Sequence, residues 1–435
     1  MSHAILAVVL GTFTLRLSTG LTGGMLVYYL DDLGVGAFTV GVFSALFYAS
    51  ELIGSPFFGV LSDRWGHRRV MLVGPAFGAV AVVATALTAD LLLLGGTRVL
   101  EGLATAASIP SILGFIAFAS AGDELLRGKS VARFEAATLA GLMAGFVLAG
   151  PLYGGLSDAA PVFQDGLGPA AFLVNAVLYG VSFLIYRLGV PKTAEPDPLE
   201  TGAARRGVDL GRYARILAGT HVWLLAPTWI AINATLGLFT SQTLFQLVNE
   251  PDPKFADQLL MGGFEPAAVS VGLGLGGLLF FAGIFYWGNR FRSMRRTTII
   301  LYGILGGAAL LAAGFGINHS AGLPVPAVLG LAAVAIGGLF VLAGATPAAI
   351  GLLADVTEAY PDDRGAIMGL YSVFLGVGQI TGSLVGGGSA QAFGLDGILG
   401  AALVMLAIAL LPLAQLRRHE HYVGGPAAPA VLGED

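Results

Sequence analysis

The stretch GVLSDRWGHRRV, residues 59–70, lies between two long apolar runs and orients the sequence on either side of it. It carries one carboxylate, three arginines and a histidine, and charges at that density do not lie in the hydrocarbon core of a bilayer. Short basic turns between membrane spans are retained on the cytosolic side during insertion. We therefore predict that residues 59–70 form a cytosolic turn between two transmembrane helices.

The composition of the chain is that of an integral membrane protein. Of its 435 residues, 56% are hydrophobic and 11% are charged, and the mean hydropathy is +0.81, whereas soluble domains carry about 25% charged residues. The apolar runs are continuous rather than alternating, which predicts helices and not a β-barrel. The sequence has no cysteine, so disulfides, thiolate metal sites and cysteine nucleophiles are excluded.

Twelve apolar runs are long enough to cross a bilayer, which needs about 20 residues per helix. We read the first run as a retained span rather than a cleaved signal, because no basic region precedes it. The runs lie at 5–30, 37–61, 70–90, 92–119, 132–156, 170–190, 221–248, 268–288, 298–317, 326–353, 365–388 and 396–415.

The positions of the basic residues support the orientation set by the turn at 59–70. If this turn is cytosolic, all but three of the 22 lysines and arginines lie in predicted cytosolic segments. The exceptions are Arg16 and Arg98, inside spans one and four, and Lys254 in a predicted external loop. We therefore expect a multi-pass protein of the plasma membrane with both termini in the cytosol.

An internal repeat divides the chain into two halves. Six residues of the first half recur in the second at one constant offset, which indicates a duplicated unit. They are Pro110, Gly114, Arg127, Gly128, Gly141 and Gly145, matched by Pro347, Gly351, Arg364, Gly365, Gly378 and Gly382. We predict an N-terminal six-helix half (1–190), a cytosolic linker with an interfacial helix (191–220), a C-terminal six-helix half (221–416) and a cytosolic tail (417–435).

The turn at 59–70 resembles the signature of the major facilitator superfamily, G-x-L-a-D-r-x-G-r-k/r. The matching residues are Gly59, Leu61, Asp63, Arg64, Gly66 and Arg68, and the departures are Ser62 and His67. The resemblance implies that Asp63 forms a latch at the start of span eleven, near Arg364. The alternative is that the turn only fixes topology through its charge.

Two further elements carry the same resemblance. Span four contains Arg98, Glu101 and Gly102, similar to the R-x-x-Q/E-G element of that superfamily. Span five is similar to the core of the element associated with its antiporters, through Gly150, Pro151, Gly154 and Gly155, although Phe146 stands where that element has a glycine. The resemblance implies an all-α integral membrane fold of twelve helices in two pseudo-symmetric six-helix halves.

Charged residues inside the spans are the main candidates for function, because they usually face a cavity or a partner. Arg16 and Glu101 lie at similar predicted depths, so we expect them to pair. Glu101 then either exchanges a proton or an ionic substrate group, or forms a permanent structural ion pair with Arg16 and Arg98. Glu51 is a second candidate carboxylate, whereas Glu135 lies near the predicted cytosolic surface and favours pairing there.

Polar residues of the second half are uncharged. They are Asn233, Gln242, Gln246 and Gln379, on spans seven and eleven, and they suit either a cavity for amphipathic molecules or hydrogen bonds between helices. The aromatic residues Trp223, Trp229, Tyr28 and Tyr29 lie near predicted span ends, where we interpret them as interfacial anchors.

These features predict a secondary active transporter working by alternating access, with proton-coupled efflux of a small amphipathic molecule as its function. The alternatives are a facilitator or a proton symporter importing a nutrient and, from another class, a membrane-embedded enzyme or a non-transporting sensor. We expect a monomer in the lipid bilayer that takes a small-molecule substrate and protons. We expect no cofactor, metal or nucleic acid.

Overall fold

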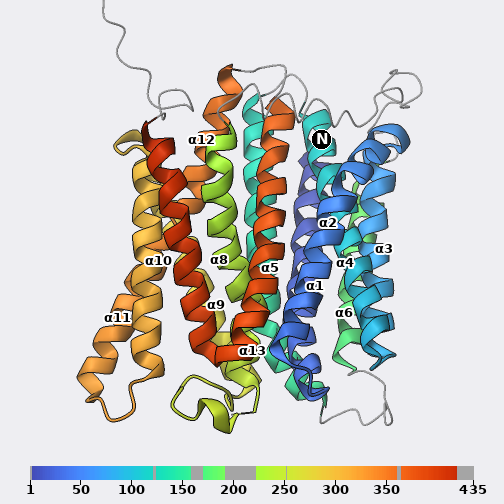
Figure 1. Cartoon of the computed structure of the whole chain (residues 1–435). Coiled ribbons are helices and arrows are strands. Elements are labelled where there is room, and N and C mark those ends of the chain that lie inside the picture. Colours follow the sequence, from blue (N-terminus) through green and yellow to red (C-terminus); the bar gives the residue numbers. More distant parts are fainter. Residues whose placement is uncertain are drawn as a thin grey trace, which may run out of the picture. The chain divides into compact units, whose positions relative to one another are not determined.

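The computed structural model describes residues 2–120, 124–157, 170–191, 222–250, 252–359 and 364–418. Every regular element within these ranges is helical (Figure 1). The elements are α1 (Ser2–Asp32), α2 (Ala37–Trp65), α3 (His67–Ala86), α4 (Leu91–Ala119), α5 (Glu124–Ser157), α6 (Ala171–Gly189), α8 (Val222–Val248), η3 (Pro253–Phe255), α9 (Pro266–Gly288), η4 (Asn289–Arg292), α10 (Arg296–Asn318), α11 (Val325–Leu342), α12 (Ala345–Ala359) and α13 (Arg364–Arg418).

The helices confirm the predicted all-α membrane fold. In the described ranges, 10 helices are long and apolar enough to cross a membrane. The last of these contains a sharp bend at Gly394, where φ is +63°, so it forms two spans. A positive φ is accessible to glycine at little cost, which is why the bend falls there. Helix α8, with 27 residues, is long enough to cross as well but is not among the 10.

Two boundaries differ from those predicted. Span five begins earlier, because α5 starts at Glu124 and the run was expected from residue 132. The predicted span 326–353 is broken into α11 and α12 at Ala343 and Gly344. Hydropathy does not register this break, because the residues on both sides of it are apolar.

The chain forms two compact units. Unit 1 comprises Met1–Val208, Leu247–Asn249 and Gly263–Gly274, and unit 2 comprises Asp209–Gln246, Glu250–Gly262 and Leu275–Asp435. The predicted C-terminal half therefore includes two short segments that pack with unit 1. The predicted interfacial helix in 191–220 and nearly all of the predicted tail lie outside the described residues.

The glycines of the internal repeat perform the same task in each unit. At four of them a Cβ atom would collide with a backbone carbonyl oxygen of the neighbouring helix, so they allow close approach of two helix backbones. These approaches join α5 to α1 through Gly141 to Phe13 and Gly145 to Leu17, and α13 to α8 through Gly378 to Ile230 and Gly382 to Ala234. The repeat seen in the sequence is thus a repeated packing arrangement.

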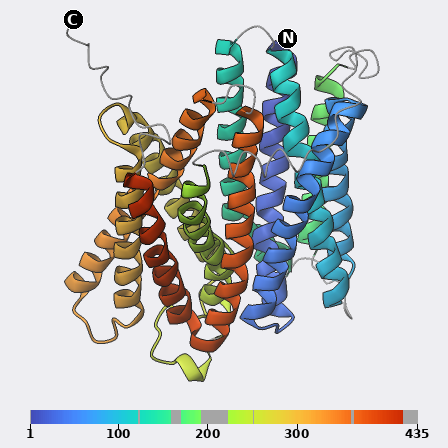
Figure 2. The same cartoon turned by 45° about the horizontal axis from the view of Figure 1, so that its top comes forward.

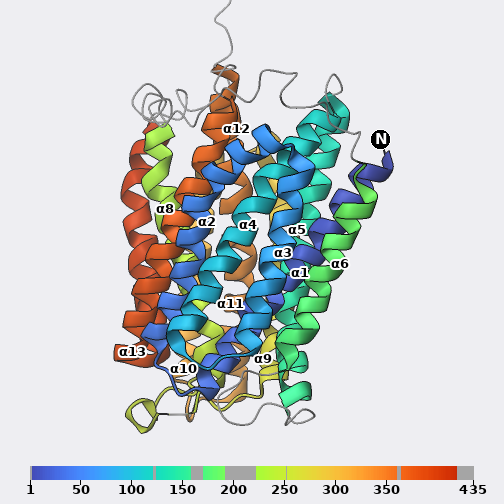
Figure 3. The same cartoon turned by 90° about the vertical axis from the view of Figure 1, so that its right-hand side faces the viewer.

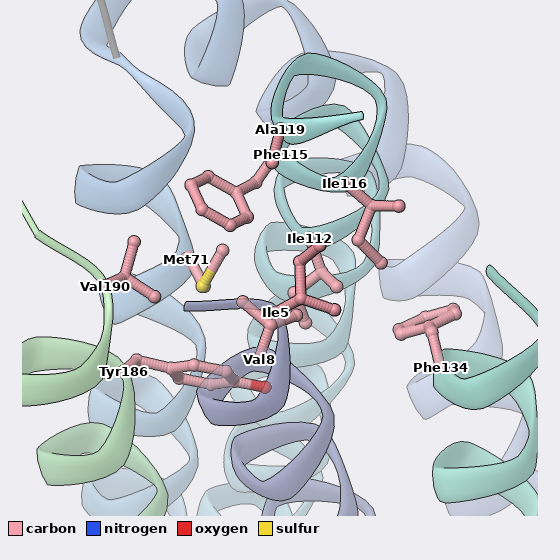
Figure 4. Close-up of a cluster of buried hydrophobic side chains, with 10 residues drawn as sticks. All are labelled: Ile5, Val8, Met71, Ile112, Phe115, Ile116, Ala119, Phe134, Tyr186 and Val190. Carbon is pink, nitrogen blue, oxygen red and sulfur yellow. The ribbon is translucent and has the colours of Figure 1, made fainter. Parts of the chain in front are cut away.

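A buried apolar cluster closes one end of the unit 1 bundle. Figure 3 shows the start of α1 beside the end of α6, and these two helices pack against each other. Figure 4 shows side chains from α1, α3, α4, α5 and α6 converging there. The cluster consists of Ile5, Val8, Met71, Ile112, Phe115, Ile116, Ala119, Phe134, Tyr186 and Val190.

The interpretation of three aromatic residues as interfacial anchors was wrong. Tyr28, Tyr29 and Trp229 are 2%, 4% and 1% exposed, so they are core residues. Anchors in the headgroup region would be accessible at their polar ends. The side chain of Trp223 lies outside the part of the chain that is described.

The glycine packing gives a first prediction. Gly145→Ala should lower the melting temperature of the purified protein, because the new Cβ would overlap Leu17 O and overpacking costs about 1–3 kcal/mol. Gly180→Ala in α6 is the matched control, since its Cβ would meet nothing within 4 Å. Equal melting temperatures for both variants would contradict the proposed role of Gly145.

Candidate functional site

The most deeply buried ionised groups of the described chain form a cluster on α4 and α6. The guanidinium of Arg98 donates from Nη1 to Glu101 Oε2, one turn further along α4. The Tyr179 hydroxyl of α6 donates to the other carboxylate oxygen, Oε1, at 3.1 Å. Glu101 is 2% exposed and Arg98 is 8% exposed. Both oxygens of the carboxylate are therefore satisfied inside the bundle.

Side chains from α1 and α2 complete the surroundings of this pair. The Arg98 guanidinium carbon lies 4.6 Å from the centre of the Phe47 ring, a cation–π geometry. Thr19 and Thr22 of α1 lie beside the Tyr179 hydroxyl. Helix α2 comes this close because Gly102 has no Cβ, which would collide with Ser50 Oγ. The cluster thus ties four helices together and is closed to water.

A second charged group is more accessible. The positive charge of Arg16, on α1, acts on the carboxyl groups of Glu51 on α2 and Glu135 on α5. Arg16 and Glu51 are partly exposed, and Glu135 is exposed. Arg16 therefore interacts electrostatically with carboxyl groups on two other helices of unit 1, and the three side chains are less buried than Arg98 and Glu101.

The structure assigns different partners from those expected. Arg16 was predicted to pair with Glu101, but the two oxygens of Glu101 are bonded to Arg98 and Tyr179. Equal depth in the membrane does not determine whether two side chains face each other, because helix rotation decides that. The i,i+3 spacing of Arg98 and Glu101 was the stronger signal, since such residues share one helix face.

Glu135 was expected near the cytosolic surface. It lies about three turns into α5, which begins at Glu124, and it is exposed, so its position near that surface stays a prediction. Tyr179 was not predicted at all. Its polar hydroxyl in an otherwise apolar span was the available signal, because buried phenols generally find a hydrogen-bond partner.

The turn at 59–70 holds the ends of three helices together. Gly66 joins α2 to α3 with φ at +91°, a conformation that favours glycine. Arg68 donates from Nε to Val190 O at 2.5 Å and from Nη2 to Arg187 O at 2.7 Å. Arg68 therefore caps the C-terminal end of α6, where free carbonyl oxygens attract a cation.

The other residues of this turn have separate environments. Gly59 and Arg64 lie in the last two turns of α2, and Asp63 is exposed there. His67 lies 3.3 Å from Ser62 Oγ through its Nδ1. The side chain of Arg364, the predicted partner region of Asp63, lies outside the described residues, so the latch stays a prediction.

The span-five element contacts the start of α9 within unit 1. The backbone N–H of Gly150 donates to Ser270 Oγ at 3.0 Å, and this oxygen lies 2.6 Å from the hydroxyl of Tyr28. A Cβ at Gly150 would collide with Pro266 O, whereas one at Gly154 or Gly155 would meet nothing within 4 Å. Only Gly150 of these glycines is required for close packing here; Pro151 follows it inside α5.

The neutral candidates of unit 2 are all buried. Asn233, Gln242, Gln246 and Gln379 are 2%, 0%, 1% and 8% exposed. Asn233 occupies the position of unit 2 that Arg16 occupies in unit 1, because Gly378 faces the Asn233 Cβ as Gly141 faces the Arg16 Cβ. The repeated scaffold therefore carries a cation in one unit and an amide in the other. In the described ranges, no group of three or more His, Asp or Glu side chains is arranged to hold a metal ion.

An all-helical bilayer fold with ionisable groups held inside its spans is an architecture found in membrane transporters. The family model of the Major Facilitator Superfamily matches residues 8–335, and the chain belongs to this family. Its members carry small-molecule substrates across membranes, and this chain is a multi-pass membrane transporter.

Curated relatives match part of the chain. Quinolone resistance protein NorA of Staphylococcus aureus (strain MRSA252) is 30% identical over 183 residues, which cover 41% of this chain and 45% of the relative. A triacylglyceride transporter of Mycobacteroides abscessus is 33% identical over 136 residues, or 31% of this chain and 24% of the relative. The matches thus span less than half the length of these relatives.

Solved structures with the same fold match nearly the whole chain. The nucleoside transporter NupG has a TM-score of 0.70 at 13% identity, covering 96% of this chain and 99% of NupG. A bacterial homologue of the human lysosomal transporter Spinster, solved inward-facing and unoccupied, has a TM-score of 0.69 and covers 99% of both chains. At such identities the likeness concerns the fold alone.

The buried pair gives a second prediction. Arg98→Leu should destabilise the protein by about 3–5 kcal/mol, because it leaves the Glu101 carboxylate buried without its cation. The double variant Arg98→Leu/Glu101→Leu should cost less than the sum of the two single changes. Melting temperatures of the four proteins measure this cycle, and strict additivity would show that the two side chains act independently.

The cap on α6 gives a third prediction. Arg68→Lys keeps the charge but loses the planar fork that reaches two carbonyl oxygens, so it should cost about 1 kcal/mol of stability. Arg69→Lys, at the exposed neighbouring position, is the control and should have no effect. A melting temperature for Arg68→Lys equal to that of the wild type would exclude the capping role.

Proposed function

We propose that this transporter is a proton-coupled exporter of small amphipathic molecules in the plasma membrane, working by alternating access. The observation that carries the proposal is the partly exposed group formed by Arg16, Glu51 and Glu135. It contrasts with the sealed Arg98–Glu101 pair, which has the character of a structural element. A group that exchanges protons or substrate must be reachable from water during the cycle.

The net charge of Arg16, Glu51 and Glu135 supports coupling of substrate transport to proton transport. With Glu51 and Glu135 both ionised, the three side chains carry a net charge of minus one beside a low-dielectric interior. Binding either one proton or one cationic head of a substrate neutralises this charge. Two ligands that neutralise the same charge compete for it, and such competition is the basis of antiport.

The neutral second unit supports an amphipathic substrate. Asn233 stands where the first unit has Arg16, and the other polar candidates of unit 2 are amides. Amides donate and accept hydrogen bonds without imposing a charge requirement. The amides of unit 2 therefore place no charge requirement on a molecule that reaches them during the cycle.

The partial relatives point to hydrophobic or amphipathic cargo. One is named for quinolone resistance and the other for triacylglyceride transport. The resemblance of the span-five element to the element associated with antiporters of the family favours antiport over import. The expected latch at Asp63 and cytosolic termini belong to the same proposal.

Proteoliposomes test this proposal with norfloxacin, a quinolone, as the probe. An imposed pH gradient should drive norfloxacin against its concentration gradient, and Glu51→Gln or Glu135→Gln should abolish this pH-driven component. Exchange of labelled for unlabelled norfloxacin at equal pH should persist in both variants, because it requires no net proton movement.

Two further variants sharpen the experiment. Glu265→Gln, an exposed carboxylate in unit 1, is the control and should keep the pH-driven component. Glu101→Gln is the second variant. We expect it to reduce transport only by lowering the stability of the protein, so the melting temperatures of all variants should be compared. Norfloxacin moving in the same direction as protons would establish symport, and unchanged pH-driven transport in Glu51→Gln and Glu135→Gln would overturn the assigned role.

A further inference from the structure

The loop between α8 and α9 is held in unit 2 by hydrogen bonds to the end of α10 and to α13. We call residues 252–262 the strap. Its backbone N–H groups at Leu259 and Leu260 donate to the backbone and side-chain oxygens of Asn318, at 2.8 and 3.0 Å. Gln258 Nε2 donates to Phe393 O at 2.9 Å, beside the bend of α13. The strap therefore lies across the end of α10 and the bend of α13 (Figure 2).

A histidine stands between the strap and the bend. His319, the residue after α10, has its Nε2 2.8 Å from Asp396 Oδ2 of α13. Its Nδ1 lies 3.6 Å from Asp257 Oδ2 of the strap, within ion-pair range but too long for a hydrogen bond. One imidazole thus faces a carboxylate with each of its nitrogens.

The form of the imidazole decides how well this arrangement holds. A neutral ring carries one N–H, so with Asp396 bonded at Nε2 its other nitrogen presents a lone pair to the Asp257 carboxylate. A protonated ring presents N–H groups to both carboxylates and adds a positive charge between two negative ones. Only the protonated ring attracts the strap and the bend at the same time.

A neighbouring amide keeps the Asp396 carboxylate in place as an acceptor. Asn318 Nδ2 donates to Asp396 Oδ1 at 2.8 Å, which prevents this carboxylate from turning away. Helix α10 contributes the ring of Phe315, 4.7 Å from the imidazole centre. The strap also contains Lys254, but its Nζ donates to Ala392 O at 3.2 Å. The charged groups facing His319 in the described chain are therefore Asp257 and Asp396.

Water reaches this histidine. Its side chain is 27% exposed, and those of Asp396 and Asp257 are 24% and 72% exposed. Protons can therefore reach the imidazole without unfolding of the unit.

We propose that His319 is a proton-binding site that fastens the strap to α10 and α13 when it is protonated. The strap lies where the chain leaves and re-enters unit 2, because Leu247–Asn249 and Gly263–Gly274 belong to unit 1. Proton binding to His319 therefore sets how strongly the strap is held to α10 and α13. In the orientation predicted from the basic residues the site lies on the outer face, and the proton it senses is then that of the exterior.

Amide hydrogen exchange of the purified full-length protein tests the proposal without any substrate. Peptides containing Leu259 and Leu260 should exchange about 2- to 5-fold more slowly at pH 6 than at pH 8 after correction for intrinsic rates, as expected of a partly exposed charge pair. His319→Gln keeps one hydrogen bond but cannot become charged, so its protection should be equal at the two pH values.

One strap variant and one neighbouring control separate the role of His319 from a general effect of pH. Asp257→Asn should abolish the pH dependence, and because Asp257 is exposed this variant should fold normally. Glu250→Gln removes a neighbouring exposed carboxylate that is not one of the groups facing His319, and should keep the full pH dependence. Wild-type protection equal at pH 6 and pH 8, or pH dependence retained in His319→Gln, would falsify the proposal. These results do not depend on proton coupling through Glu51.

Discussion

Close approach of helix backbones is the constraint on which both units depend. In lipid there is little hydrophobic drive between helices, so association relies on tight packing and on small residues at the contact. Gly145 in unit 1 and Gly382 in unit 2 bring two backbones together at equivalent points. The positions of Arg16 and Glu135 depend on these approaches, because the glycines bring the backbones of α1 and α5 together.

The same packing separates two kinds of buried charge. Glu101 lies inside the contacts of α1, α2, α4 and α6, and both of its carboxylate oxygens are hydrogen-bonded. Its pairing with Arg98 therefore has the character of a structural ion pair. Glu51 and Glu135 face Arg16 where the packing leaves access. Burial alone is therefore a poor guide to function in a transporter, since the groups that must exchange ligands are those left partly open.

Much of the fold was predictable from the sequence, because its spans are limited by hydropathy. The repeat was predictable as well, since Gly378 and Gly382 match Gly141 and Gly145. Contacts between different helices were not predictable, because depth along a helix is set by sequence but facing direction is set by packing. The contact of Glu101 with Tyr179 and the burial of Trp229 were missed for this reason.

The cap that Arg68 places on α6 has a mechanical consequence. Val190, whose carbonyl oxygen Arg68 holds, is the point at which the chain leaves α6 for the long connection to the second half. A displacement of Val190 would break this hydrogen bond before it disturbed the rest of α6. The α2–α3 turn is therefore coupled to the end of α6, and a movement there would be transmitted to residues 59–70.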